Sequence, residues 1–181
     1  NCFGFPNSQD PSVMKQGLSD FGKEAVGELN RLGMIIDVSH LSDGGFWDVA
    51  RLSRKPFVAS HSNARALCPH PRNLTDEMIR AVGEAGGVVG LNHCPKFLYP
   101  DSRENRIEDL VRHLLHIRNV GGLEAAALGS DFDGISGKLA LKGPQDYGKL
   151  TEALRREGLS REEIEKIYHK NAERVIRDVM G

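Results

Sequence analysis

Short apolar runs alternate with amphipathic segments along most of this chain, and this alternation limits its possible folds more than any other feature. Each apolar run is four or five residues long, and the segments between them repeat apolar residues every three or four positions. This repeat predicts helices with one buried face. Strands separated by helices are typical of βαβ units and a parallel sheet. The predicted strands lie at residues 34–38, 56–59, 87–91 and 126–129.

Polar residues with capping side chains indicate where the helices begin. Ser19, Ser42 and Thr75 each precede an amphipathic segment and are predicted to be N-caps. Residues 160–163 read Ser-Arg-Glu-Glu, the pattern of a capping box that opens the last helix. That helix is expected to bury Ile164, Ile167, Tyr168, Ala172, Val175, Ile176 and Val179.

The length of the chain predicts one partial domain. Its 181 residues can bury a core but fall short of the ~250 residues of a closed (β/α)8 barrel. We therefore expect residues 1–181 to form a single partial domain. Residues 1–17 are rich in Asn, Ser, Gly and Pro and are expected to form an N-terminal loop.

Charge and cysteine content narrow the classes of partner. A net charge of −1 argues against a nucleic-acid or membrane-surface partner. No apolar run approaches the ~20 residues that span a bilayer, so no membrane segment is expected in this chain. The cysteines, Cys2, Cys68 and Cys94, are odd in number and widely spaced, which predicts free thiols and favours a cytoplasmic location.

Polar side chains follow each of the four predicted strands. His40 follows the first strand, His61 the second, Asn92 and His93 the third, and Asp131 the fourth. In parallel α/β folds the active site gathers at the carboxyl ends of the strands. Neutral imidazoles bind zinc well, and two of them here end consecutive strands. The pattern predicts a metal site with His40 and His61 as ligands.

Two further residues are candidates for substrate recognition and catalysis. Arg72 lies on the loop after the second strand, where a guanidinium could hold a substrate carboxylate in a bidentate fork. Asp131 and Asp133 would face the same side of a continued strand, so spacing alone does not choose between them. We select Asp131 because it lies nearer the strand end, whereas Asp133 fits turn chemistry.

The other histidines are weaker candidates. His113 and His116 lie off the apolar stripe of their predicted helix, which favours a solvated face. His169 is interpreted as structural or solvated, and His70 as a residue of the site's rim. His93 and its neighbour Asn92 remain alternatives for the inward-facing position after the third strand.

Five segments carry motifs in the same order as those of a known family. The segments are 28–40 (ELNRLGMIIDVSH), 60–68 (SHSNARALC), 71–74 (PRNL), 129–134 (GSDFDG), and Asn171 with Arg174 and Val175. Together they run over essentially the whole chain. They resemble the membrane (renal) dipeptidase family, zinc peptidase family M19, whose fold is an amidohydrolase-like barrel.

The resemblance implies an α/β fold: the C-terminal half of a (β/α)8 barrel, with about four parallel strands, flanking helices and a C-terminal helix. It implies a two-zinc site that hydrolyses dipeptides, including those with a C-terminal D-residue. By the resemblance, His40 and His61 bind the second zinc and Arg72 binds the free carboxylate of the dipeptide. Asp131 would hold the substrate amino group or the tetrahedral intermediate and assist proton transfer.

The family's other metal ligands, a His-x-Asp pair and a bridging glutamate, have no counterpart in this chain. Two protein ligands are one short of the three usual in a catalytic zinc site. We therefore expect the chain alone to bind metal weakly and to be inactive. It is expected to associate with the missing N-terminal half or to form a homo-oligomer. The alternatives are another barrel amidohydrolase that acts on cyclic amides or esters, and a non-catalytic half-barrel.

Overall fold

The structure, a computed structural model, describes residues 2–181 and contains a parallel sheet of four strands in the order β1-β2-β3-β4. The prediction of four parallel strands is confirmed, although each strand is shorter than its apolar run. β1 is the shortest strand, and Met34, predicted to start it, is exposed. The strands are β1 (Ile36–Asp37), β2 (Phe57–Ala59), β3 (Val88–Leu91) and β4 (Ala126–Leu128).

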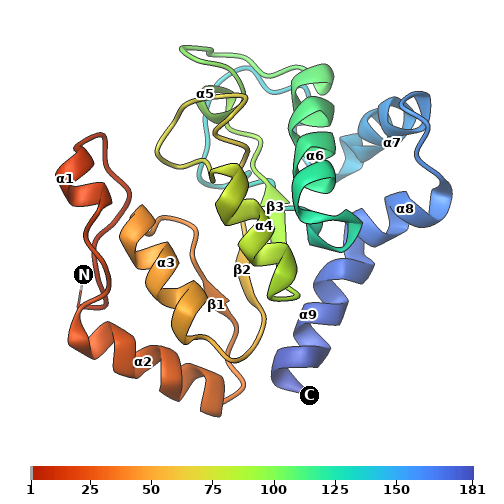
Figure 1. The fold of residues 1–181 in the computed structure, drawn as a ribbon. Helices are drawn as coiled ribbons and strands as arrows, with labels where there is room; N and C mark the ends of the chain where they lie inside the picture. The colour runs from red at the N-terminus through yellow and green to blue at the C-terminus, as the bar shows by residue number, and fades with distance from the viewer. Residues whose placement is uncertain (1) are drawn as a thin grey trace.

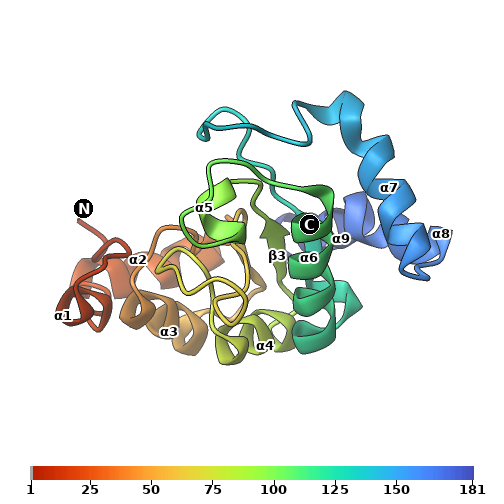
Figure 2. The ribbon, with the colours of Figure 1, turned by 90° about the horizontal axis from the view of Figure 1, so that it is seen from above.

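Helices connect the strands and cover one face of the sheet. Figures 1 and 2 show α3, α4 and α6 side by side on that face. No helix in the described part of the chain is long and apolar enough to cross a membrane. The longer helices are α2 (Asp20–Arg31), α3 (Asp43–Leu52), α4 (Asp76–Glu84), α6 (Ile107–Gly121), α7 (Tyr147–Arg156) and α9 (Asn171–Met180). The short ones are α1 (Pro11–Met14), α5 (Pro95–Leu98), α8 (Arg161–Glu165), the 3-10 turns η1 (Leu123–Ala125) and η2 (Pro144–Asp146), and the π turn η3 (Lys166–Lys170).

The predicted helix starts are confirmed by side-chain hydrogen bonds. The hydroxyls of Ser19, Ser42 and Thr75 each accept a backbone N–H from the first turn of α2, α3 and α4. Ser160 and Glu163 form the expected capping box at α8. Each cap satisfies a helix N–H that has no partner within the helix.

Three segments differ from the sequence-based prediction. The N-terminal segment contains the short helix α1, because the Asp10 carboxylate caps it and Pro11 suits its first turn. The prolines within residues 94–104 predict a loop, but this segment contains α5, which also begins at a proline. The last helix is interrupted by η3, whose wider π turn displaces the residues after it around the helix axis.

The two faces of the sheet bury different sets of residues. Phe57 and Ala59 belong to the main core on the α3–α6 side. Alternate strand residues point to the opposite face, where the cluster of Val58, Val88, Ala127, Val175 and Val179 joins the sheet to α9. The prediction that the last helix buries Ile176 is wrong: this side chain is 48% exposed, because the second face of the sheet is only partly covered.

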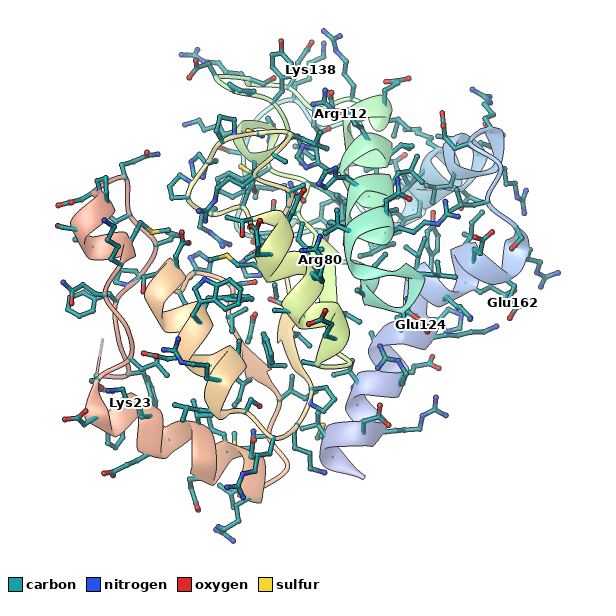
Figure 3. The ribbon with its side chains drawn as sticks, viewed as in Figure 1. Lys23, Arg80, Arg112, Glu124, Lys138 and Glu162 are labelled. Atoms are coloured by element: carbon teal, nitrogen blue, oxygen red, sulfur yellow. The ribbon has the colours of Figure 1, made fainter. Side chains whose placement is uncertain are left out.

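The prediction of a solvated face for His113 is also wrong. His113 is fully buried; its Nδ1 accepts the backbone N–H of Ala64 at 3.2 Å, and its Nε2–H donates to the carbonyl of Leu98 at 2.9 Å. The loop after β2 crosses the helix at this point and covers the ring. His116 is partly exposed and contacts the Asp76 carboxylate. Arg112, labelled in Figure 3 on the same helix, is exposed, and its Nη2 donates to the carbonyl of Leu98 at 3.3 Å.

Candidate metal and substrate site

His40 and His61 lie against each other at the carboxyl ends of β1 and β2. Their Nε2 atoms are 2.9 Å apart, and their ring centroids are separated by 5.0 Å. Neighbouring parallel strands bring their carboxyl ends to one edge of the sheet, which is why residues 21 positions apart in the sequence meet. The structure therefore brings the two predicted ligands together with the same ring nitrogen of each directed to one point.

The backbone at His40 is unusual for a residue with a β-carbon. Its φ is 78°, in the left-handed region that favours glycine. Asp131 has a φ of 64°, and Asp101 is the remaining non-glycine residue with positive φ among those described. Strained backbone of this kind costs roughly 1–3 kcal/mol per residue and clusters at functional sites. Two of the predicted site residues thus carry such strain.

The surroundings of the two imidazoles favour their neutral forms. Partial burial lowers the pKa of His40, and the positive charge of Arg72 lowers it further. The same two causes lower the pKa of His61. A neutral imidazole has a lone pair for a metal, so both rings are suited to coordination at neutral pH.

The residues at this edge fit a zinc ion only in part. Zinc–nitrogen bonds of about 2.05 Å in a tetrahedral arrangement separate two ligand atoms by about 3.3 Å, close to the observed Nε2 separation. However, no group of three or more His, Cys, Asp or Glu side chains among residues 2–181 is arranged to hold a metal ion. The histidine pair would need ligands from outside the described residues.

Arg72 lies beside the histidine pair with its guanidinium largely withdrawn from solvent. The residue is 7% exposed; its Nη2 donates to the backbone carbonyl of His61 at 3.3 Å, and its guanidinium carbon lies 5.5 Å from the centre of the Phe97 ring. Burial lowers the pKa of Arg72, while the charges of Asp131 and Asp37 oppose that shift. A buried cation with one weak hydrogen bond retains donors for an anionic group.

Asp131 faces Asn92 across the ends of β3 and β4. The Nδ2 group of Asn92 donates to Oδ2 of Asp131 at 3.1 Å, and Asn92 is fully buried. The negative charge of Asp131 opposes the lowering of the pKa of both His40 and His61, which places the carboxylate near the histidine pair. Asp133 is exposed on the following turn. Of the two alternatives after the third strand, Asn92 and His93, Asn92 is therefore the one aimed at the site.

The remaining histidines make no hydrogen bond to His40 or His61 among the described residues. His93 is fully buried between Phe132 and Tyr147, with ring centroids 5.2 and 5.9 Å away. His70 lies on the rim, where its Nδ1 accepts the backbone N–H of Arg72. His169 is exposed and contacts Glu173 on the last helix.

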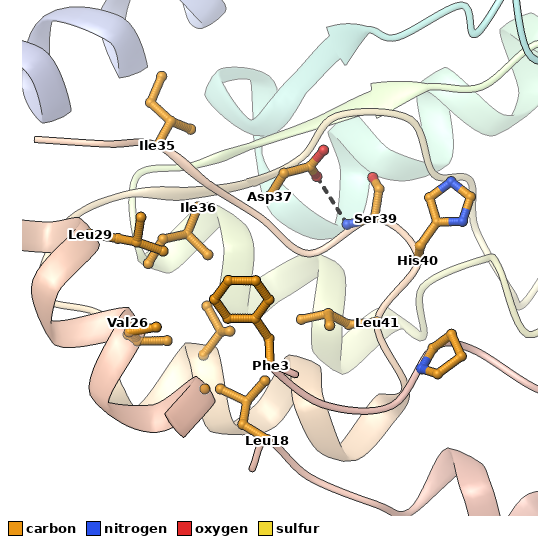
Figure 4. Close-up of a pocket in the computed structure, with 14 residues that line it drawn as sticks. Phe3, Leu18, Val26, Leu29, Ile35, Ile36, Asp37, Ser39, His40 and Leu41 are labelled. Atoms are coloured by element: carbon orange, nitrogen blue, oxygen red, sulfur yellow. Dashed lines mark hydrogen bonds between the residues drawn. The ribbon is translucent and has the colours of Figure 1, made fainter. Parts of the chain in front are cut away.

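An apolar pocket of about 320 Å³ opens beside β1. In Figure 4, Asp37, Ser39 and His40 border its upper side, and apolar side chains including Phe3 and Leu18 lie below them. Among the residues that line it in the described part of the chain, neither Arg72 nor Asp131 occurs. The pocket is therefore distinct from the predicted substrate site at Arg72 and Asp131, although His40 borders both.

The sequence model of one family, "Membrane dipeptidase (Peptidase family M19)", matches residues 5–180. The chain belongs to this family. The resemblance on five motifs is confirmed, and the M19 match covers all four βα units and the last helix.

Solved metallo peptidase structures match the fold closely. The chain superposes on a metallo peptidase from Rhodobacter sphaeroides, liganded with a phosphinate mimic of the dipeptide L-Ala-D-Ala, with a TM-score of 0.86 and 37% identity. The match covers 97% of this chain and 49% of that chain. The four parallel strands and their helices are the C-terminal half of an M19 (β/α)8 barrel.

Curated relatives show the same relation in length. A Klebsiella pneumoniae protein described as "Uncharacterized protein in pqqA 5'region" is 40% identical over 97% of this chain and 65% of its own length. "Dipeptidase tcpJ" of Claviceps purpurea is 37% identical over 90% of this chain and 39% of its own. The chain therefore spans roughly two fifths to two thirds of the relatives that it matches.

Proposed function

We propose that this chain forms the second-metal and substrate-recognition half of a zinc-dependent dipeptidase, with His40 and His61 as ligands of one of two zinc ions. The observation that carries the proposal is the 2.9 Å approach of the two Nε2 atoms at the carboxyl ends of adjacent strands. Membership of the M19 family and the metallo peptidase relative support a metal cofactor. A zinc ion there supplies Lewis-acid chemistry and makes water acidic enough to serve as a nucleophile at neutral pH.

Arg72 and Asp131 are proposed to recognise the two charged ends of a dipeptide. The Arg72 guanidinium would bind the free carboxylate, since it is buried and carries unused donors. Asp131 would hold the substrate amino group or the tetrahedral intermediate and assist proton transfer, with its carboxylate held by Asn92. A site that requires both charged ends accepts dipeptides and rejects longer peptides. The ligand of the Rhodobacter sphaeroides relative supports acceptance of a C-terminal D-residue.

The complete site is proposed to need the first half of the barrel. Two protein ligands are fewer than a catalytic zinc site requires, and β1 and β4 each pair with one neighbour only among the described residues. Unpaired strand edges favour association with another polypeptide. This chain combined with the first half of an M19 relative is termed the assembled barrel.

Zinc content and dipeptide hydrolysis test this proposal. The assembled barrel is expected to bind two zinc ions and to hydrolyse L-Ala-D-Ala, whereas the chain alone binds zinc weakly and shows no turnover. H40A and H61A should each remove one zinc equivalent from the assembled barrel. Full turnover by the isolated chain would refute the need for a second half, and unchanged zinc content in both variants would refute the ligand assignment.

A further inference from the structure

Asp37, the last residue of β1, accepts hydrogen bonds from the neighbouring strand end with both of its oxygens. Oδ1 accepts the backbone N–H groups of Ser39 at 2.9 Å and Ser60 at 3.0 Å. Oδ2 accepts the hydroxyl of Ser60 at 2.5 Å. Figure 4 shows the Asp37 side chain turned toward Ser39 at the border of the β1 pocket. The carboxylate therefore joins the carboxyl ends of β1 and β2.

The Ser60 hydroxyl continues this network to the His61 ring. Its oxygen lies 2.7 Å from Nδ1 of His61. A hydroxyl has a single hydrogen, and a carboxylate can only accept, so that hydrogen points to Asp37. The Ser60 oxygen must then accept from His61, which requires a hydrogen on Nδ1. A neutral ring with hydrogen on Nδ1 has its lone pair on Nε2, the atom that faces His40.

We infer that Asp37 and Ser60 are positioning residues that hold His61 in the Nδ1–H tautomer and so keep its Nε2 lone pair available for a metal. The role in metal binding rests on the proposed function. The tautomer of His61 is a property of the metal-free chain. Ligand histidines in metal sites commonly donate their second N–H to an orienting group. Here a hydroxyl stands between the ring and the carboxylate.

The isosteric substitution D37N provides a sharp test because it should reverse the hydrogen-bond direction. The asparagine oxygen must stay at the Oδ1 position, since two backbone N–H groups point there. Its NH2 group then takes the Oδ2 position and donates to the Ser60 oxygen. The Ser60 hydrogen is released to donate to His61 Nδ1, which favours hydrogen on Nε2 and blocks metal binding.

The first experiment reads the tautomer of His61 directly in the metal-free chain. Long-range ¹H–¹⁵N correlation spectra distinguish Nδ1–H from Nε2–H imidazoles, and comparison with H61Q assigns the signal. At about pH 8, above the ordinary histidine pKa, we expect Nδ1–H in the unmodified chain and Nε2–H in D37N. We call the hydrogen-bonded link from Asp37 through the Ser60 hydroxyl to His61 the relay. S60A removes this link, so a mixture of tautomers is expected. An Nε2–H ring in the unmodified chain, or an unchanged tautomer in D37N, would overturn the inference.

The second experiment measures zinc affinity by competition with a chromogenic chelator. D37N and S60A are expected to weaken zinc binding about 10- to 100-fold, the usual effect of removing an orienting partner. S62A is the matched control for S60A: Ser62 flanks His61 on its other side, and its hydroxyl has no hydrogen-bond partner among the described residues. D133N controls for the lost negative charge, since Asp133 is exposed on the loop after β4.

The two readouts separate this inference from the proposed function. If the unmodified chain shows the Nδ1–H tautomer but neither it nor the assembled barrel binds zinc, the relay stands and the metal site fails. If zinc binds and both variants bind it as tightly as S62A and D133N, the relay has no role in metal binding and the inference fails. A backbone amide spectrum of each variant verifies that the fold is retained.

Discussion

The Nδ2 group of Asn92 donates a hydrogen bond to Oδ2 of Asp131 across the ends of β3 and β4, over 3.1 Å. Asn92 is itself held in place, because its Oδ1 accepts the backbone N–H of Cys94 at 2.7 Å. Its backbone N–H donates to the Asn63 side chain at 2.9 Å. Asn92 thus fixes the direction of the Asp131 carboxylate, although Asp131 itself lies on strained backbone with φ of 64°.

This relationship predicts that N92A lowers kcat/KM of the assembled barrel for dipeptides about 10- to 100-fold, because a carboxylate that loses its donor is poorly oriented. The kinetic measurement should include D131A and the double variant N92A/D131A. If Asn92 acts through Asp131, the double variant is no worse than D131A alone. Fully additive losses would show that Asn92 acts by another route.

Arg72 leads to a prediction about the substrate rather than the catalytic step. R72A should raise KM for a dipeptide about 10- to 150-fold. This change corresponds to the loss of one charge-assisted hydrogen-bonded contact, which contributes about 1.5–3 kcal/mol to binding. R72K should recover part of this loss, because lysine keeps the charge but not the bidentate fork.

The control for R72A is a dipeptide amide, which lacks the free carboxylate. The unmodified assembled barrel should hydrolyse this substrate poorly, and R72A should make little further difference to it. An equal loss in kcat/KM for the dipeptide and its amide would contradict the role of Arg72 in binding the carboxylate.

The sequence could predict the arrangement of the candidate site because strand order determines it. His40, His61 and Asp131 each follow a strand of a parallel sheet, and consecutive parallel strands place such residues at one edge. Their proximity follows from the βα pattern, and the resemblance to M19 adds their proposed roles. The roles themselves stay predictions.

The sequence could not predict features that depend on the paths of loops. His113 lies off the apolar stripe of α6, but the loop after β2 and the helix α5 cover the ring, and each supplies one backbone partner, the N–H of Ala64 and the carbonyl of Leu98. Ile176 follows the helical repeat of the last helix, yet it faces a surface that the described residues cover only in part. Periodicity reports which face of a helix is apolar and says nothing about what covers that face.

His113 supports a prediction about stability. H113L should destabilise the chain by about 1–3 kcal/mol, because the buried N–H of Ala64 loses its partner and the carbonyl of Leu98 keeps only the 3.3 Å hydrogen bond from Arg112. The same substitution at the exposed His169 is the control and should change the free energy of unfolding by less than about 0.5 kcal/mol. Urea unfolding of both variants measures the difference, and a loss in H113L as small as that in H169L would contradict the structural role of His113.

His93 predicts a dependence of stability on pH. Burial lowers the pKa of His93 to about 4 in the folded chain, whereas an unfolded histidine has a pKa of about 6.5. Between these values the unfolded state binds more protons, so the free energy of unfolding should fall as the pH drops from about 6.5 to about 4. The shift corresponds to about 3 kcal/mol, and His113, whose pKa is also lowered to about 4, adds a similar effect.

The variant H93F isolates the contribution of His93. Neither ring nitrogen of His93 has a hydrogen-bond partner among the described residues, and the ring packs edge-on against Phe132 and Tyr147. A phenylalanine keeps the aromatic contacts and removes the buried polar atoms, so H93F should be about 1–3 kcal/mol more stable at neutral pH. Urea unfolding at several pH values should show that H93F loses less stability than the unmodified chain between about pH 6.5 and 4. Equal pH slopes for the two proteins would mean that His93 is accessible to protons in the folded state.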